Sequence, residues 1–203
     1  MSPERQNRIE TVLLNRQPGL TVVMENVNDP HNISAVMRTC DAVGIQDIYV
    51  LNTVIAKHEY FGPKSSSSAA KWLTIHEYDN AETCFKTLRS RYKTIYTTHL
   101  CADSISVFDI NFQDDIALVF GNEHDGVTEA TRKLSDGNFI IPQVGMIQSL
   151  NISVACAISI YEAFRQKNNA GHYHGLGKPH PSLDTLNRKW TIKPPVRTKW
   201  RKH

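Results

Sequence analysis

The sequence predicts an α/β protein whose sheet is mainly parallel and covered by helices on both faces. Short apolar runs alternate along the chain with segments of helical spacing, which is typical of strand–helix–strand units. The runs are apolar throughout rather than at every second residue, as expected of strands buried on both faces. A length of 203 residues suits one domain with short appendages.

Capping residues and apolar spacing place the helices. Ser2 followed by Pro3 opens one helix, and Asp29 followed by Pro30 opens a second that Gly44 ends. Asp79 is expected to cap a third. In chain order the predicted helices cover about residues 3–16, 30–43, 79–91, 128–134 and 149–167. The last is apolar on most faces, which indicates burial in the core or in a subunit interface.

Apolar runs rich in β-branched residues predict the strands. They span residues 20–25, 47–51, 72–75, 93–98, 116–120 and 139–141. Residues 170–203 hold four of the nine prolines and little periodicity, so we expect an extended or partly helical segment there. The chain is therefore divided into a domain over residues 1–169 and a C-terminal extension over residues 170–203.

Charge is divided unevenly between these two parts. The chain has 23 Lys and Arg residues against 20 Asp and Glu, a formal net charge of +3. Residues 178–203 alone carry eight basic residues and one acid, Asp184, so the remainder is slightly acidic. A basic segment on an acidic body indicates contact with a polyanion, either nucleic acid or an anionic membrane.

Several classes of protein do not fit the sequence. No run approaches the roughly 20 apolar residues of a membrane span, and the polar start MSPERQNRIE is unlike a secretory signal. The four cysteines are scattered without a CxxC pair, as in reduced, cytoplasmic proteins. None of the nine histidines has metal-ligand spacing, so we expect no metal site.

Nucleotide-binding loops are also missing. Ligands of open α/β folds bind at the carboxyl ends of strands, yet the loop after residues 20–25 has no glycine and the chain has no GxGxxG. Gly121 and Gly126 have the spacing of a P-loop, but Val127-Thr128 follows where Lys-Ser/Thr is required. A nicotinamide-dependent enzyme would fit the alternation of elements but lacks its phosphate loop.

Three segments resemble the motifs of one enzyme family. Residues 28–44 (NDPHNISAVMRTCDAVG) resemble the first motif of the SpoU/TrmH branch of the SPOUT RNA methyltransferases. Residues 120–127 (FGNEHDGV) resemble the second motif, and residues 141–155 (IPQVGMIQSLNISVA) the third. The segments RQPGLTV and YEAFRQ are similar to the tRNA guanosine 2′-O-methyltransferases of that family. The likeness covers about residues 5–175, and three motifs in order are far more specific than one.

The resemblance implies a fold and a reaction that periodicity does not reveal. The family's sheet ends in a deep trefoil knot, here over roughly residues 94–160, although knots are otherwise rare. S-adenosylmethionine binds in the knot loops, and a homodimer forms through the knot region. The implied reaction methylates a ribose 2′-hydroxyl of RNA, and the implied substrate is tRNA, at guanosine 18 of the D-loop.

Five positions match catalytic residues of the family: Asn32, Arg38, Glu123, Ser149 and Asn151. Because arginine stays protonated in proteins, we expect Arg38 to stabilise the phosphate and the developing alkoxide rather than to take the proton. The resemblance makes Asn32 a positioner of Arg38 or of the neighbouring subunit, and Glu123 a residue that orients Arg38 or the substrate. Ser149 and Asn151 would position the substrate, although Ser149 also suits a helix cap.

The cofactor contacts implied by the resemblance are Thr98, Leu100, Gly121, Ile141 and Leu150. They would act mostly through backbone groups and apolar side chains, so no polar signature is expected. Pattern alone would place Ile141 and Leu150 in the core.

Basic residues are expected to hold the RNA. Lys64 and Lys71 belong to the family's substrate-side loop, although the intervening serines equally suit a flexible polar loop. In the extension we expect phosphate contacts from Lys189, Arg197, Lys199 and Arg201. Trp190 and Trp200 either stack on bases or pack on the body.

Two departures from the family pattern concern the substrate more than the chemistry. Asn28-Asp29 stands where relatives carry basic residues, and His124-Asp125 follows Glu123 where relatives often have lysine. Both lower the positive charge near the expected RNA face. The alternatives to the tRNA target are ribosomal RNA, another tRNA loop, or a non-catalytic RNA-binding protein of the same fold.

Overall fold

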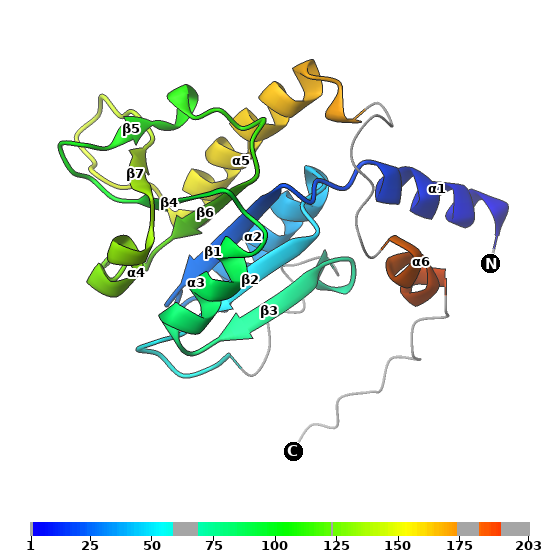
Figure 1. The fold of residues 1–203 in the computed structure, drawn as a ribbon, viewed down its shortest axis with the longest axis horizontal. Helices are drawn as coiled ribbons and strands as arrows, with labels where there is room; N and C mark the ends of the chain where they lie inside the picture. Colours follow the sequence, from blue (N-terminus) through cyan, green and yellow to red (C-terminus); the bar gives the residue numbers. More distant parts are fainter. Residues whose placement is uncertain (1, 59–68, 123, 174–182, 192–203) are drawn as a thin grey trace.

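A computed structural model describes residues 2–58, 69–122, 124–173 and 183–191. These residues form one sheet of seven strands in the order β3-β2-β1-β6-β4-β7-β5 (Figure 1). All neighbouring strands are parallel, which confirms the predicted fold class. The strands are β1 Leu20–Glu25, β2 Asp47–Leu51, β3 Thr74–Tyr78, β4 Thr94–Thr98, β5 Ile105–Ser106, β6 Ile116–Phe120 and β7 Gly137–Ile140.

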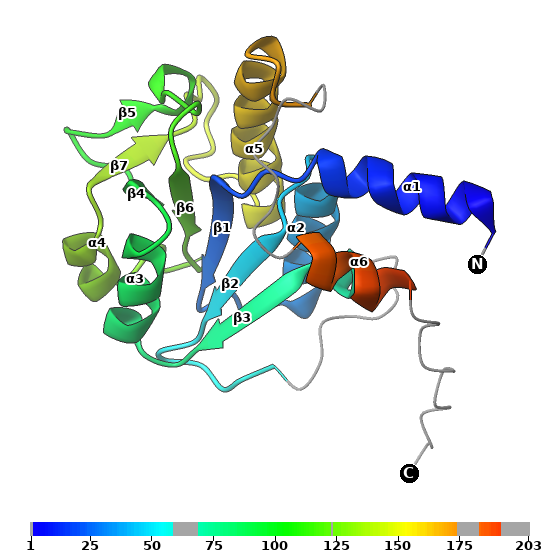
Figure 2. The same ribbon diagram turned by 45° about the vertical axis from the view of Figure 1, so that its right-hand side comes forward.

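Helices cover both faces of this sheet, as Figure 2 shows. One face lies beneath α2 (Pro30–Ala42) and α5 (Ile152–Asn169), and the other beneath α3 (Ala81–Arg89) and α4 (Glu129–Leu134). Beyond the sheet, α1 (Pro3–Leu14) and α6 (Leu183–Thr191) lie side by side.

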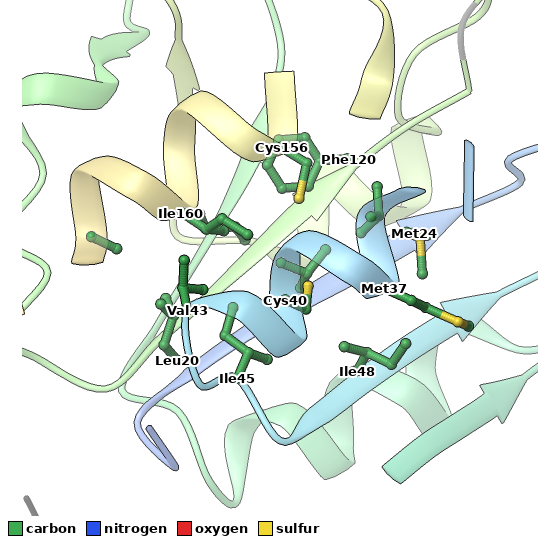
Figure 3. Close-up of a cluster of buried hydrophobic side chains, with 14 of the residues drawn as sticks. Leu20, Met24, Met37, Cys40, Val43, Ile45, Ile48, Phe120, Cys156 and Ile160 are labelled. Atoms are coloured by element: carbon green, nitrogen blue, oxygen red, sulfur yellow. The ribbon is translucent and has the colours of Figure 1, made fainter. Parts of the chain in front are cut away.

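Alternate residues of the central strands feed two separate cores. In β1, Leu20, Val22 and Met24 belong to the core beneath α2 and α5, whereas Val23 belongs to the core beneath α3. Figure 3 shows the first of these cores, where Cys40 and Cys156 come from the two helices. Burial of every residue in β1 explains why Val22, Val23 and Met24 are apolar in succession rather than at every second position.

Most predicted element boundaries lie within one residue of the observed ones, and the main corrections among the helices fall at two helix starts. Asn80, not Asp79, caps α3, because its side chain accepts a hydrogen bond from the Thr83 N–H at 2.8 Å. Asn151, not Ser149, caps α5. In both places two polar residues compete, and the path of the preceding loop decides which takes the extended conformation of a cap.

Element ends and short segments account for the remaining differences. The helix predicted over residues 3–16 ends at Leu14, and the strand predicted over residues 139–141 is Gly137–Ile140. The strand predicted over residues 72–75 begins at Thr74, because Ala69–Lys71 form a 3₁₀ turn and Trp72 follows it outside the strand. β5 has only two residues and no pattern that predicts it. The predicted stop at Gly44 is confirmed: its φ is 85°, and an added Cβ would lie 2.4 Å from the Asn15 carbonyl oxygen.

The C-terminal extension returns to the body through α6. Trp190 is buried, and its ring meets the Trp72 ring edge-on, with 5.4 Å between centroids. The Arg16 guanidinium lies 5.2 Å from the centre of the Trp190 ring and forms a 2.7 Å ion pair with Asp41 of α2. Of the two interpretations of Trp190, packing on the body is confirmed, whereas Trp200 lies outside the described residues.

Three other expectations concern the chain as a whole. Among the described helices, none has both the length and the apolar character needed to cross a bilayer. The knot over residues 94–160 concerns how the chain is threaded, which strand order does not report, and it stays a prediction. The boundary between residues 169 and 170 also stays a prediction, and α5 ends there, at Asn169.

Candidate active site

The carboxyl ends of three neighbouring strands bring the predicted cofactor residues to one edge of the sheet. β4 lies between β6 and β7, so Thr98, Gly121 and Ile141 stand where adjacent parallel strands end. Thr98 Oγ1 donates to the Val119 carbonyl of β6 at 3.3 Å. Leu100 is 71% exposed in the loop after β4. This edge is the place where an open α/β fold binds its ligand.

The loop between β7 and α5 carries two of the predicted cofactor contacts, Ile141 and Leu150. Ile141 packs against the edge of the core, whereas Leu150 is only half-buried, so the core position suggested by pattern alone is wrong for Leu150. Residues 142–149 between them are exposed. The loop therefore presents backbone and side chains to the same edge of the sheet.

The tight loop after β6 is built around Gly121. Asn122 and Gly126 exchange backbone hydrogen bonds of 3.0 and 2.9 Å. A Cβ on Gly121 would lie 2.1 Å from the Gly126 carbonyl carbon, so no residue with a side chain fits there. Glu123, predicted to orient Arg38 or the substrate, lies outside the described residues.

A pair of asparagines joins the first and third motifs. Asn151 Nδ2 donates to Asn32 Oδ1 at 3.2 Å, which links the first turn of α2 to the start of α5. Asn151 Oδ1 accepts from the backbone N–H and the hydroxyl of Ser153 at 2.8 and 2.6 Å. The Asn151 amide is thus held between its own helix and Asn32. Ser149 is exposed two residues earlier.

Arg38 lies on the same helix as Asn32, about 9 Å farther along its axis. It is exposed and lines an open groove between α2 and α5 of about 430 Å³. The other residues of the groove are mostly small: Ala35, Thr39, Ala42, Ala157 and Tyr161. An accessible guanidinium beside small side chains can receive a phosphate group.

His99 is a member of this edge that sequence reasoning did not single out. It lies between Thr98 and Leu100, and its Nε2 is 2.9 Å from Nη1 of Arg132 on α4. Partial desolvation and the charge of Arg132 lower the pKa of His99, so its ring accepts the hydrogen bond in the neutral form. A polar residue inside the β4 loop is the only sequence signal that could have indicated it.

The predicted RNA-contacting residues are only partly described. Lys71 and Lys189 are both exposed, as a phosphate contact requires. Lys64, Arg197, Lys199 and Arg201 lie outside the described residues. Trp190 is buried against α1 and Trp72, which leaves its faces unavailable for stacking on a base.

Possible metal ligands and thiols are dispersed over the described part of the chain. It contains no group of three or more His, Cys, Asp or Glu side chains placed to hold a metal ion. All four cysteines are free thiols. Burial, followed by the negative charge of Glu25, raises the pKa of the Cys84 thiol to about 12, so this thiol is unreactive near neutral pH.

Known proteins share this arrangement. Residues 19–161 match the SpoU rRNA Methylase family. The chain belongs to this SpoU family. A tRNA (guanosine(18)-2′-O)-methyltransferase of Thermus thermophilus is 40% identical over 169 residues, which cover 83% of this chain and 86% of the relative.

Solved SpoU structures have the same fold. The Aquifex aeolicus TrmH/SpoU tRNA modifying enzyme superposes with a TM-score of 0.85 at 33% identity, covering 92% of this chain and 94% of that one. The SpoU methyltransferase AviRb from Streptomyces viridochromogenes, in complex with the cofactor AdoMet, gives 0.67 at 28% identity, covering 76% and 62%. The family match contains all three segments that resemble SpoU motifs.

Proposed function

We propose that this protein is an S-adenosylmethionine-dependent methyltransferase that modifies the 2′-hydroxyl of guanosine 18 in the D-loop of tRNA. The observation that carries the proposal is the hydrogen bond between Asn32 and Asn151. It joins two of the segments that resemble SpoU motifs, beside the strand ends that carry the expected cofactor contacts. The similarity to a tRNA (guanosine(18)-2′-O)-methyltransferase supports the choice of nucleotide.

The residues at the strand ends suit S-adenosylmethionine. The exposed side chain of Leu100 offers apolar surface for the adenine, and the partly buried Ile141 and Leu150 add to it. The exposed backbone of residues 142–149 offers N–H and C=O groups for the polar atoms of the nucleoside and the methionine. When bound, S-adenosylmethionine supplies a methyl group activated on a sulfonium.

Arg38 would carry the chemistry on the RNA side. A ribose 2′-hydroxyl is a very weak acid, so the transfer needs both alignment of the hydroxyl and help in removing its proton. The exposed guanidinium can hold the adjacent RNA phosphate in a bidentate contact and stabilise the negative charge that develops on the 2′-oxygen. Because arginine stays protonated, it cannot take the proton of the 2′-hydroxyl. We propose that the RNA phosphate held by Arg38 accepts this proton.

The neighbouring residues would position these groups. Asn32 and Asn151 together fix the start of α2, and hence the direction of the helix that carries Arg38. Ser149 lies in the exposed loop that leads to Asn151 and would contact the substrate. For Glu123 the SpoU pattern supports a role in orienting Arg38 or the substrate.

The C-terminal extension would supply affinity for tRNA. Residues 178–203 carry a net charge of +7, and Lys189 on α6 is exposed. Release of counterions from phosphates makes such binding steeply dependent on salt. We therefore assign residues 1–169 to the methyltransferase domain and residues 170–203 to an RNA-binding extension that also includes α6.

A homodimer would complete the molecule. Large apolar side chains are exposed on the loop before α5 and on α5 itself: Val144, Met146, Ile147, Val154 and Tyr161. Tyr161 also lines the Arg38 groove, so a second copy covering this surface would bring its own residues near Arg38. Sedimentation equilibrium should give a dimer, and a monomer at micromolar concentration would contradict this assignment. The site of action would be the cytoplasm.

The reaction is tested with labelled S-adenosylmethionine and two RNA pools, total tRNA and ribosomal RNA, from a strain lacking the gene. We expect transfer to tRNA only. Transfer to ribosomal RNA would show that the substrate is ribosomal RNA and not tRNA, while the proposed methyl-transfer reaction would still hold. Absence of transfer to any RNA, together with absence of cofactor binding, would favour a non-catalytic RNA-binding protein.

A further inference from the structure

Glu25, the last residue of β1, is a fully buried carboxylate that the proposed reaction does not use. It accepts three hydrogen bonds. The Thr128 N–H donates to Oε2 at 3.0 Å, and the hydroxyls of Thr128 and Thr131 each donate to Oε1 at 2.6 Å. All three donors belong to the end of the β6 loop and the first turn of α4.

No cation balances this buried charge within the part of the chain that the structure describes. The ion pairs found there involve other acids, and Glu25 forms none of them. Burial of an ionised group is costly unless polar partners replace water. The threonine donors therefore have to remain in place for Glu25 to stay buried, and the carboxylate in turn fixes their position.

The neighbouring residue holds the other end of the same loop. Asn26, with a φ of 51°, accepts a 2.8 Å hydrogen bond at its carbonyl from Asn122 Nδ2. The Asn26 side chain is itself held by the backbone N–H groups of Thr53 and Val54, at 2.8 and 3.1 Å. The loop that starts at Gly121 is therefore anchored at both ends. Asn26 holds its beginning through Asn122, and Glu25 holds its end through Thr128.

We propose that Glu25 is a positioning residue that holds the described part of the loop after β6, residues 121–122 and 124–128, in the shape that binds the methyl donor. This inference rests on the proposed function, because Gly121 in this loop is one of the expected cofactor contacts. An apolar residue would serve β1 equally well if packing were the only requirement, since the preceding residues Val22, Val23 and Met24 are all apolar. Glu25 breaks that pattern beside the active site, where such exceptions are expected.

The test measures the affinity for S-adenosylmethionine by calorimetry without RNA. Glu25→Gln replaces one carboxylate oxygen by an NH₂ group, so that either the Thr128 N–H or the two threonine hydroxyls lose the oxygen that accepts their hydrogen bonds. We expect this variant to bind about tenfold more weakly. Thr131→Val keeps the shape but removes one donor to Glu25, and we expect a loss of about threefold. Thr131→Ser keeps the hydroxyl and should restore binding close to that of the wild type.

The matched control is Asp47→Asn. Asp47 is also a buried acid, but it pairs with Arg91 and His76 at the start of β2, on the opposite edge of the sheet. We expect this variant to lose stability in urea unfolding while its affinity for S-adenosylmethionine remains unchanged. A purely structural role for Glu25 would instead make affinity follow stability in both variants.

The possible outcomes distinguish failure of the positioning role of Glu25 from failure of the proposed function. Wild-type affinity in Glu25→Gln, or equal losses of affinity in Glu25→Gln and Asp47→Asn, would overturn the positioning role. If Glu25→Gln does not fold, equal affinities of Thr131→Val and wild type would overturn it. A wild-type protein that binds the cofactor but methylates no RNA would overturn only the proposed function, whereas failure to bind the cofactor would overturn both.

Discussion

At the scale of single residues, we propose that Arg38 acts as a cation and not as a base. Arg38 is exposed beside a groove lined by small side chains, so a phosphate can reach its guanidinium. We expect Arg38→Ala to lower methyl transfer by at least about 100-fold, since it removes the stabilisation of developing negative charge. Arg38→Lys should not restore the rate, because lysine lacks the planar fork. Initial rates at saturating tRNA measure both.

Measuring cofactor binding distinguishes a loss of methyl transfer in Arg38→Ala from misfolding of the variant. S-adenosylmethionine should bind to Arg38→Ala as tightly as to the wild type. Lys93→Ala is the matched control, because Lys93 is an exposed cation paired with Asp114 at the amino end of β4, away from the site. Its turnover should be unchanged. Full turnover in Arg38→Ala would remove Arg38 from the reaction.

We expect His99 to make the stability of the folded protein depend on pH. Its pKa is lowered by desolvation and by Arg132, so the unfolded chain binds a proton more readily than the folded protein. The stabilisation from neutral His99 is therefore present above the ordinary histidine pKa of about 6.5 and is lost as the pH falls below it. Urea unfolding at pH 7.5 and 5.5 should show a smaller loss for His99→Gln than for the wild type. An equal or larger loss in the variant would contradict this linkage.

At the scale of elements, the contact between α2 and α5 turns two separate motifs into one site. Asn151 caps α5 and also reaches Asn32, and these two roles can be separated. We expect Asn151→Ser to keep the cap, with a free energy of unfolding within about 0.5 kcal/mol of the wild type. Serine is too short to reach Asn32, so methyl transfer should fall about tenfold or more.

Asn151→Ala is the companion variant, because it removes both roles. Its stability should fall by about 1 kcal/mol, together with its activity. Urea unfolding and initial rates on the same preparations compare the two effects. Full activity in Asn151→Ser would show that the hydrogen bond to Asn32 has no part in catalysis.

Elements with many buried residues could be predicted from the sequence, and short or competing ones could not. β1, β2 and β6 are confirmed to the residue because both of their faces are buried, so apolar residues fill successive rather than alternate positions in each strand. The caps at Asn80 and Asn151 were obscured by neighbouring Asp79 and Ser149, since local pattern does not separate adjacent polar residues. β5 depends entirely on its pairing with β7.

Some residues of the candidate site could likewise be predicted from the sequence, and others could not. Arg38 and Asn32 could be named because they belong to a motif with a resemblance to a known family. Glu25 and His99 could not, because one closes an apolar strand and the other sits in an unremarkable loop. Only the fold places them against Thr128, Thr131 and Arg132.

At the scale of the whole molecule, positive charge is concentrated toward the end of the sequence. Residues 192–203 contain five of the basic residues: Lys193, Arg197, Lys199, Arg201 and Lys202. A chain that ends at Thr191 keeps α6 but loses these charges. We expect its tRNA affinity to fall less steeply with salt, with the log–log slope reduced in magnitude by up to about 3–4. Filter binding across a salt series measures this slope.

The control for the truncation keeps the length of the chain. A full-length variant with the same five residues replaced by serine should reproduce the reduced slope, because charge and not length is responsible. An unchanged slope in both variants would mean that these five residues do not contact the phosphates of the RNA.

The central claim is the position of the methyl group, and mapping it on tRNA is the most direct measurement. Purified protein would be incubated with S-adenosylmethionine and tRNA from a strain lacking the gene, and each 2′-O-methylated nucleotide would then be located by mass spectrometry. The account predicts one new 2′-O-methylguanosine, at position 18 of the D-loop, that Arg38→Ala does not produce. A methyl group at another nucleotide, on a base rather than a ribose, or absent from tRNA altogether would contradict it.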